Sequence, residues 1–240
     1  MISEPQNKTT PHSVMKLLSY LRYGSYITDH WNLRLALFTI FYEIKGERKY
    51  GIDTTGIEEI WQYDISTEDL SEAESYQPSS YYILEKLFLH LPPEALRGSI
   101  IDFGCGKGRA LVVAMAFGFK KLIGVEIIHE LSRDAEQNLL HNKVDKKDNE
   151  FSILNNRAQS IPIPDDSSVF LFFNPFKQQV MELVLQNILD SYKKNPRTLY
   201  VFYLNPVYKK IFFDNKFREL YHVQKLTYLE GSILVLDGPD

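Results

Sequence analysis

The sequence predicts an α/β protein built on a doubly wound, mostly parallel β-sheet. From residue 79 onward, short apolar runs alternate with longer segments that have helical periodicity. The runs SIIDF at 99–103 and TLYVFYLN at 198–205 are apolar at nearly every position, as is typical of strands covered by helices on both faces. With 240 residues, of which 44% are hydrophobic, the chain can bury a sizeable core.

The predicted elements follow one another in a regular order. A first helix at 79–91 begins at serine residues and ends before two prolines. Strands and helices then alternate, with strands at 99–103, 120–127, 150–156, 167–174 and 198–205 and helices at 108–118, 129–143, 178–194 and 206–220. The last two runs, at 222–230 and 232–238, flank Glu230-Gly231, a turn signal, and predict a C-terminal antiparallel hairpin.

Residues 1–75 do not follow this alternation, and we expect them to form an N-terminal extension before a domain at 76–240. The apolar stretch at 33–44 is about half the ~20 residues that a membrane-spanning helix needs, so it predicts a buried helix or strand. The segment EIKGERKYGI at 43–52 is a candidate for a pair of strands. The acidic segment STEDLSEAES at 66–75 predicts a solvated linker.

Charge and cysteine content narrow the class of protein. The formal net charge is −4, without the basic surplus of an electrostatic nucleic-acid binder. The single cysteine, Cys105, has no partner for an intramolecular disulfide, and the N-terminus shows no secretory pattern, so we expect a cytoplasmic protein. The six histidines lack metal-binding spacing, and no metal site is predicted. Residues 13–26 mix Lys16 and Arg22 with apolar side chains, which keeps peripheral membrane contact as an alternative.

The segment IIDFGCGKGRALVVA at 100–114 carries three glycines at alternate positions between a predicted strand and a predicted helix. Ligands of doubly wound sheets bind at such strand ends, where glycines let the backbone approach a ligand and the helix start offers free N–H groups. A dinucleotide fingerprint requires glycine at position 109, where Arg109 stands, and no Walker loop occurs. The spacing G-x-G-x-G after an acidic residue is the pattern of S-adenosylmethionine binding.

Residues 76–240 resemble the class I S-adenosylmethionine-dependent methyltransferases. The resemblance implies a seven-stranded Rossmann-like sheet with a closing hairpin, and S-adenosylmethionine as cofactor. Together with the glycine segment, YQPSS at 76–80 and LIGVEI at 122–127 are similar to a poorly characterised bacterial group and to lysine methyltransferases that carry a YxPS/T segment. KYGIDTTG at 49–56 is also similar to a segment of that bacterial group.

The resemblance implies cofactor contacts for a defined set of residues. Glu126 lies 24 positions after Asp102 and is expected to accept hydrogen bonds from the ribose hydroxyls, although a strand-end carboxylate can also simply be solvated. Asp102 is expected beneath the methionine amino end. Further contacts are implied for Tyr76, Gly104, Cys105, Gly106, Gly108, Arg109, Ala158 and Asn174. At the adenine end Arg157 stands where an acidic residue is common, so Asn156 or the backbone N–H near Ala158 is expected to serve.

The segment FFNPF at 172–176 resembles the [DN]-P-P-[YF] motif of N-methyltransferases, with its second proline missing. The resemblance implies that Asn174, Pro175 and Phe176 hold a target amine, whereas the local alternative is an ordinary Asn-Pro turn. Tyr76 and Pro78 are implied to line the methionine end and the acceptor channel, although a proline there is also a common helix start.

We therefore expect an S-adenosylmethionine-dependent methyltransferase that methylates a nitrogen atom of a protein lysine or of another amine. A small-molecule or lipid methyltransferase is the first alternative, with residues 1–75 as a lid over the acceptor. A non-catalytic S-adenosylmethionine-binding module is a second alternative. A nicotinamide-dependent oxidoreductase is disfavoured because the third glycine comes one position too early.

Overall fold

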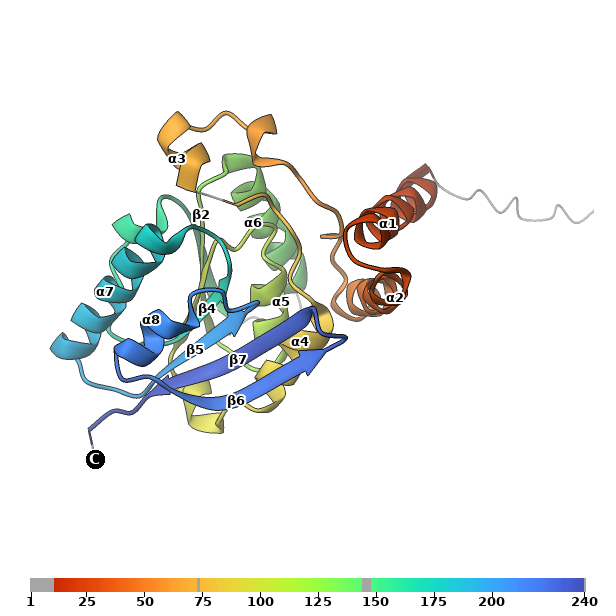
Figure 1. Ribbon diagram of the computed structural model, residues 1–240. Coiled ribbons are helices and arrows are strands. Elements are labelled where there is room, and N and C mark those ends of the chain that lie inside the picture. Colours follow the sequence, from red (N-terminus) through yellow and green to blue (C-terminus); the bar gives the residue numbers. More distant parts are fainter. Residues whose placement is uncertain (1–10, 73, 144–147, 240) are drawn as a thin grey trace, which may run out of the picture.

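The computed structural model describes residues 11–72, 74–143 and 148–239 and contains a central seven-stranded sheet (Figure 1). Its strands are β1 (Ser99–Phe103), β2 (Lys121–Glu126), β3 (Glu150–Asn155), β4 (Ser167–Phe173), β5 (Leu199–Leu204), β6 (Arg218–Lys225) and β7 (Leu229–Leu236). The strand order is β3-β2-β1-β4-β5-β7-β6, with β7 antiparallel to both β5 and β6. The predicted fold class, including the C-terminal antiparallel hairpin, is confirmed.

Helices cover both faces of this sheet (Figure 1). The helices of the described chain are α1 (Pro11–His30), α2 (Leu33–Tyr50), α3 (Thr67–Glu72), α4 (Tyr81–Leu89), α5 (Arg109–Ala116), α6 (His129–Lys143), α7 (Gln178–Lys194) and α8 (Lys209–Asp214). The short 3₁₀ helices are η1 (Ile60–Gln62), η2 (Pro93–Arg97) and η3 (Ala158–Ser160). Helices α4, α5 and α6 share one hydrophobic core with the sheet, and α7 and α8 share the other.

Strand β1 shows why the central runs are apolar at successive positions. Ile100 packs in the core under α4–α6, whereas Ile101 and Phe103 pack in the core under α7 and α8. Successive side chains of a strand point to opposite faces, so a strand with helices on both faces buries every position. All five residues of β1 are buried, Asp102 included.

The strand order reverses at β1. This strand pairs in parallel with β2 on one side and with β4 on the other, and Phe103 lies level with both Val125 and Phe172. The chain segments that follow β1 and β4 therefore leave the sheet next to each other. In doubly wound sheets this reversal opens a crevice at the carboxyl ends of the strands, and a ligand-binding pocket is expected there.

The turn of the C-terminal hairpin lies earlier than the sequence predicts. Residues 226–228 connect β6 to β7, and both Leu226 and Thr227 have positive φ values of 53° and 67°. Gly231 lies inside β7, where a Cβ would come within 2.5 Å of Ile83 on α4. The glycine thus permits close packing of helix on strand. The predicted helix at 206–220 shortens to α8, because the chain from Arg218 onward pairs in β6.

The N-terminal extension is helical. The segment at 43–52, a candidate for paired strands, belongs mostly to α2, which ends where Gly51 adopts a left-handed φ of 66°. The stretch at 33–44 is helical as well, as one of the two predicted options. Much of the predicted acidic linker forms α3, and its residue 73 lies outside the described residues. Of the helices in the described part of the chain, none has the length and apolar character needed to cross a membrane.

Candidate functional site

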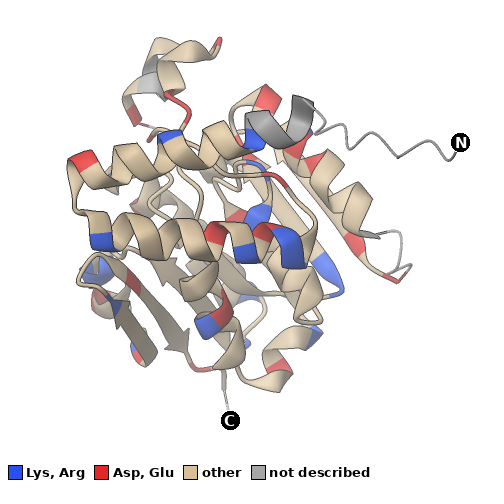
Figure 2. Ribbon diagram, turned by 90° about the vertical axis from the view of Figure 1, so that its right-hand side faces the viewer, with Lys and Arg blue, Asp and Glu red and all other residues tan. Residues whose placement is uncertain are grey.

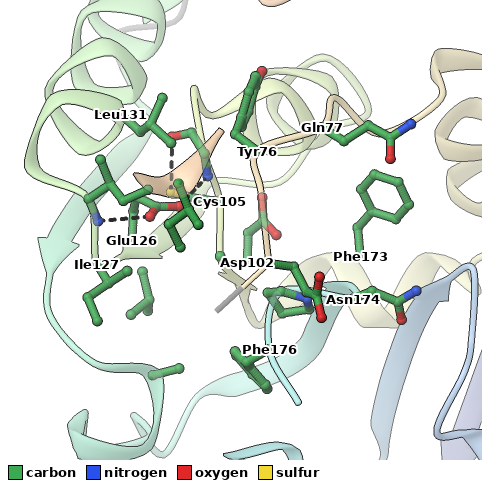
Figure 3. A pocket seen from close by; sticks show the side chains of 18 of the residues that line it. Tyr76, Gln77, Asp102, Cys105, Glu126, Ile127, Leu131, Phe173, Asn174 and Phe176 are labelled. Atoms are coloured by element: carbon green, nitrogen blue, oxygen red, sulfur yellow. Dashed lines mark hydrogen bonds between the residues drawn. The ribbon is translucent and has the colours of Figure 1, made fainter. Parts of the chain in front are cut away.

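A cavity of about 140 Å³ lies at the carboxyl ends of β1, β2 and β4. Residues 74–79, the loop between β1 and α5, and the segments after β2, β3 and β4 line it. Figure 3 shows Tyr76, Asp102, Glu126 and Asn174 around the same space, although they come from four separate parts of the chain. The structure therefore brings most of the predicted site residues together.

Two glycines of the loop are required by neighbouring protein atoms. Gly104 and Gly106 both line the cavity and have left-handed φ values of 72° and 51°. A Cβ at Gly104 would collide with the ring of Pro175, and one at Gly106 with the ring of Tyr76. The glycines thus let the loop pack closely against the very segments that carry the other predicted site residues.

Gly108 and Cys105 differ from these two glycines. Gly108 is absent from the cavity lining and has a left-handed φ of 76° at the start of α5, where a Cβ would lie 3.1 Å from Ala135 of α6. The absence of a side chain at Gly108 lets α5 and α6 approach each other. A direct contact of Gly108 with the cofactor stays a prediction. Cys105 lines the cavity, but burial raises the pKa of its thiol well above the usual range and keeps it protonated.

Glu126 ends β2 and orders the glycine loop. One carboxylate oxygen accepts a hydrogen bond from the backbone N–H of Gly106 at 2.8 Å, and the other accepts from Ile128 at 2.9 Å (Figure 3). Burial raises the pKa of this carboxyl, and the two backbone donors oppose that rise. Each carboxylate oxygen can accept more than one hydrogen bond, so the side chain retains capacity for a hydroxyl donor in the cavity.

Asp102 is a second buried acid in the same cavity, with 3% of its surface exposed. Burial raises its pKa to about 8, and the nearby Glu126 carboxylate adds to the rise. Two acids in a space of low polarity destabilise each other when both are ionised. A cation in the cavity would favour ionisation of both.

The segment Asn174-Pro175-Phe176 borders the cavity where β4 ends. Asn174 has a left-handed φ of 41°, a conformation that asparagine tolerates better than most residues. Its Oδ1 atom is buried and finds no hydrogen-bond partner among the described residues. Phe176 is buried against Phe172, with ring centroids 6.3 Å apart.

Tyr76 spans the cavity and the N-terminal extension. Its hydroxyl donates to the carbonyl of Thr54 at 2.8 Å, and its backbone pairs with Glu58 in an isolated antiparallel bridge. Its ring packs over Gly106, with the ammonium of Lys107 5.4 Å from the ring centroid. Tyr76 lines the cavity, and its contact with a cofactor stays a prediction.

Arg109 lines the cavity, but its guanidinium is engaged within the protein. It donates to Glu43 at 2.7 and 2.6 Å and to the carbonyl of Ser79 at 2.8 Å, and its Nε donates to Thr54. Burial alone lowers the pKa of Arg109, but the Glu43 carboxylate outweighs that effect and raises it. The side chain therefore fastens the N-terminal extension to the helix that follows the glycine loop.

The far end of the cavity combines polar and apolar groups. Asn156, Arg157 and Ala158 all line it, and their contact with an adenine ring stays a prediction. Sequence reasoning missed the apolar residues Ile128 and Leu131, which line the cavity and pack together in a separate small core.

The residue types fit a nucleoside with a cationic amino-acid end. The cavity offers buried carboxylates, an apolar wall and polar backbone within one space. Buried carboxylates are stabilised by a cation, and an apolar wall suits a purine ring.

Comparison with known proteins places the cavity in a recognised domain. Residues 101–192 match the model of a family described as a methyltransferase domain. This segment contains the glycine loop, Glu126 and Asn174-Pro175-Phe176. No curated protein matches the chain.

Several solved structures are similar to the chain at low identity. A ribosomal protein L11 methylase from Lactobacillus delbrueckii subsp. bulgaricus has 14% identity, with 69% of this chain and 91% of that chain covered and a TM-score of 0.49. A SAM-dependent methyltransferase from Leishmania major has 10% identity, 64% and 70% coverage and a TM-score of 0.49. The magnesium protoporphyrin IX methyltransferase of Synechocystis PCC 6803, with bound SAM, has 13% identity, 67% and 85% coverage and a TM-score of 0.48. At these identities and TM-scores, the methyl acceptors of these proteins are not assigned to this chain.

The sheet has the strand order expected for the fold, and its ligand pocket lies at the carboxyl edge. The family model covers the three central segments that build this pocket. Together these observations identify the chain as carrying the methyltransferase domain of an enzyme whose cofactor is S-adenosylmethionine.

Proposed function

We propose that this enzyme methylates a nitrogen atom, and that the side chain of Asn174 holds the acceptor amine. The observation that carries the proposal is the buried Oδ1 atom of Asn174, which finds no partner among the described residues although its residue borders the cavity. An unsatisfied buried carbonyl costs about 1–3 kcal/mol. Its terminal torsion is soft, so a small rotation turns the oxygen towards an N–H donor in the cavity.

In methyl transfer the protein mainly has to align the acceptor nitrogen with the methyl group of the cofactor. When bound, S-adenosylmethionine supplies a methyl group on a positively charged sulfur. The amine lone pair forms the new C–N bond while the C–S bond breaks, its electron pair stays on sulfur, and the ammonium product releases a proton to water. Asn174 accepts a hydrogen bond from the amine N–H, which leaves the nitrogen lone pair directed away from the amide oxygen. Such positioning supplies much of the rate enhancement in a displacement reaction.

The neighbours of Asn174 support this role. Pro175 packs against Gly104, so the loop that carries Asn174 and the glycine loop are held in mutual contact. The missing second proline of the motif therefore does not separate the Asn174 segment from the glycine loop. The segment 76–78 lines the same cavity, in line with the resemblance to YxPS/T lysine methyltransferases, and a protein lysine is one amine of the proposed class.

The experiment that tests the proposal compares Asn174→Ala with Asn205→Ala. Asn205 follows β5, has a similar left-handed φ of 48° and also precedes a proline, so both variants strain the backbone alike. With tritiated S-adenosylmethionine and a panel of amines and lysine peptides, kcat of Asn174→Ala should fall by roughly 100- to 1,000-fold. Asn174→Asp should be milder, because a carboxylate also accepts from an amine.

Both variants should bind S-adenosylhomocysteine within a few-fold of the parent enzyme, and equal changes in their free energies of unfolding would separate backbone strain from the loss of kcat in Asn174→Ala. Transfer to oxygen, sulfur or carbon acceptors, with Asn174→Ala fully active, would contradict the assignment to nitrogen.

A further inference from the structure

A second cavity, of about 300 Å³, lies beside the first. It is bounded by the N-terminal helix pair (α1 and α2), by the ends of β4 and β5, and by the turn between β6 and β7. Tyr23 and Ile27 of α1 pack with Leu229 of β7 in one small core, so the helix pair is seated on the hairpin (Figure 1). Apart from Phe173, its lining residues lie outside the matched methyltransferase segment.

The two cavities share one wall. Gln77, Pro78 and Phe173 line both of them. In Figure 3, Phe173 stands between Gln77 and Asn174 at the edge of the first cavity. Phe173 of β4 is also paired with Leu204 of β5, which lines the second cavity. A molecule in the second cavity that extends past Phe173 therefore enters the space that Asn174 borders.

The lining of the second cavity combines aromatic and aliphatic side chains with polar ones. Its apolar side chains include Tyr23, Ile27, Trp31, Leu35, Phe173 and Tyr228. Such a surface binds the apolar body of a ligand, while a few polar groups fix its orientation. The polar groups at the rim include Asn205 and Thr227.

The charges of the lining are acidic. Glu43 and Glu230 line the second cavity, and its described lining includes no Lys or Arg. Glu43 is neutralised by Arg109, so Glu230 provides the remaining negative charge. An anionic acceptor would be desolvated beside the Glu230 carboxylate, whose nearest described basic group is the His222 ring at 3.8 Å, and that is costly. A neutral amine has no charge to desolvate, and a cationic amine is attracted by the same carboxylate.

The size of the cavity distinguishes between kinds of amine. The unbranched side chain of a lysine would cover less of the apolar lining than an amine with an aromatic or alkyl body, so it would bury less apolar surface. The helix pair is also fastened over the cavity by the buried pair of Glu43 and Arg109. Figure 2 shows several charged residues along the C-terminal half of α2, and Trp31, at the connection between the helices, is 40% exposed.

We infer that the second cavity is the acceptor site, and that the acceptor is a small amine with an apolar aromatic or alkyl body. The inference rests on the proposed function, because it assumes an amine that reaches Asn174. The apolar body lies among the aromatic side chains between the helix pair and the β6–β7 turn. The amine extends past Phe173 towards Asn174.

The test compares two tryptophans in the full chain. Trp31 lines the second cavity, whereas Trp61 is 71% exposed and lines neither cavity. A panel with 2-phenylethylamine, hexylamine, 3-phenylpropanoate and a lysine peptide is offered with tritiated S-adenosylmethionine. Binding of the same molecules is measured by calorimetry in the presence of S-adenosylhomocysteine. Tyr228→Ala is a second variant of the lining, at a residue that is 46% exposed and tolerant of truncation.

We expect the two apolar amines to bind and to be methylated, and the anion to do neither. Trp31→Ala and Tyr228→Ala should raise KM and Kd for these amines at least tenfold and leave S-adenosylhomocysteine affinity unchanged, and Trp61→Ala should change none of them. Preference for the lysine peptide or the anion, or no binding of either apolar amine, would overturn the inference. Methylation that depends on Asn174 but not on Trp31 and Tyr228 would overturn it and leave the proposed function standing. Binding that depends on Trp31 without transfer to nitrogen would instead contradict the proposed function.

Discussion

The carboxylate of Glu43 on α2 and the guanidinium of Arg109 on α5 form a buried, two-pronged ion pair with distances of 2.7 and 2.6 Å. These residues lie 66 positions apart, and Arg109 is the first residue of the helix after the glycine loop. The pair therefore joins the N-terminal helix pair to the cofactor end of the sheet. Glu47 adds to the junction by accepting from the backbone N–H groups of Thr54 and Thr55, each at 2.9 Å.

The first prediction concerns this ion pair. Both side chains are at most 3% exposed, so Glu43→Ala leaves a buried guanidinium without its counter-charge. Removal of one partner from a buried pair costs about 3–5 kcal/mol. The free energy of unfolding in urea should fall by that amount. Asp190→Ala is the control, because its pair with Lys193 is exposed and contributes about 0–1 kcal/mol. Equal losses in the two variants would show that the N-terminal helices are not fastened in this way.

The second prediction separates two roles of glycine. Gly51 and Gly104 have similar left-handed φ values of 66° and 72°, but a Cβ at Gly51 meets open space and one at Gly104 meets Pro175. Gly51→Ala should lose about 1–2 kcal/mol from backbone strain alone. Gly104→Ala should lose about 1–3 kcal/mol more from overpacking, and it should weaken S-adenosylhomocysteine binding because the loop that carries Asn174 is displaced. Urea unfolding and calorimetry measure the two effects. Equal losses of unfolding free energy and equal S-adenosylhomocysteine affinities in the two variants would contradict the close contact between Gly104 and Pro175.

The third prediction concerns protons. With a pKa of about 8, raised chiefly by burial, Asp102 is mostly protonated at pH 7. The positively charged cofactor lowers this pKa on binding, so binding at pH 7 should release up to about one proton. Affinity should accordingly rise with pH and level off above pH 8. Calorimetry of S-adenosylmethionine binding in two buffers of different ionisation enthalpy gives the proton count.

The matched variant for this measurement is Asp102→Asn, which should release no proton from this position. Because the pKa of Asp102 in the folded protein lies above the ordinary pKa of an aspartate, the stability that protonated Asp102 contributes is present at low pH and is lost as pH rises through 8. The parent protein should therefore lose stability relative to Asp102→Asn between about pH 4 and pH 8. A binding reaction with no proton release in the parent protein would contradict the raised pKa.

The sheet was predictable because its central strands β1, β4 and β5 are apolar at nearly every position. Local signals were enough to find β1, the glycine loop and the acid at the end of β2. Gly231 misled the prediction, since a glycine that admits the side chain of Ile83 is indistinguishable in sequence from a turn glycine. The actual turn at Leu226 and Thr227 carries no turn residue of the usual kind.

Contacts between distant segments were out of reach of the sequence. Nothing local to Arg109 indicates a partner 66 residues earlier, and the resemblance suggested a cofactor contact for it instead. The second cavity is likewise invisible in sequence, because its wall combines α1, α2 and the β6–β7 turn. The glycine pattern pointed to a loop that lines the cavity, while the reason for each glycine depended on Pro175, Tyr76 and Ala135 from elsewhere in the fold.

The most direct test of the account is calorimetric titration of S-adenosylhomocysteine into the parent protein and the Glu126→Ala variant, with Glu130→Ala as an exposed acidic control four residues later. Glu126→Ala removes the carboxylate that orders Gly106 and that is proposed to bind the ribose. The account predicts a loss of about 1.5–3 kcal/mol in binding free energy, roughly 10- to 150-fold in Kd, with the control unchanged. Equal affinity in all three proteins would contradict the assignment of this pocket as the cofactor site.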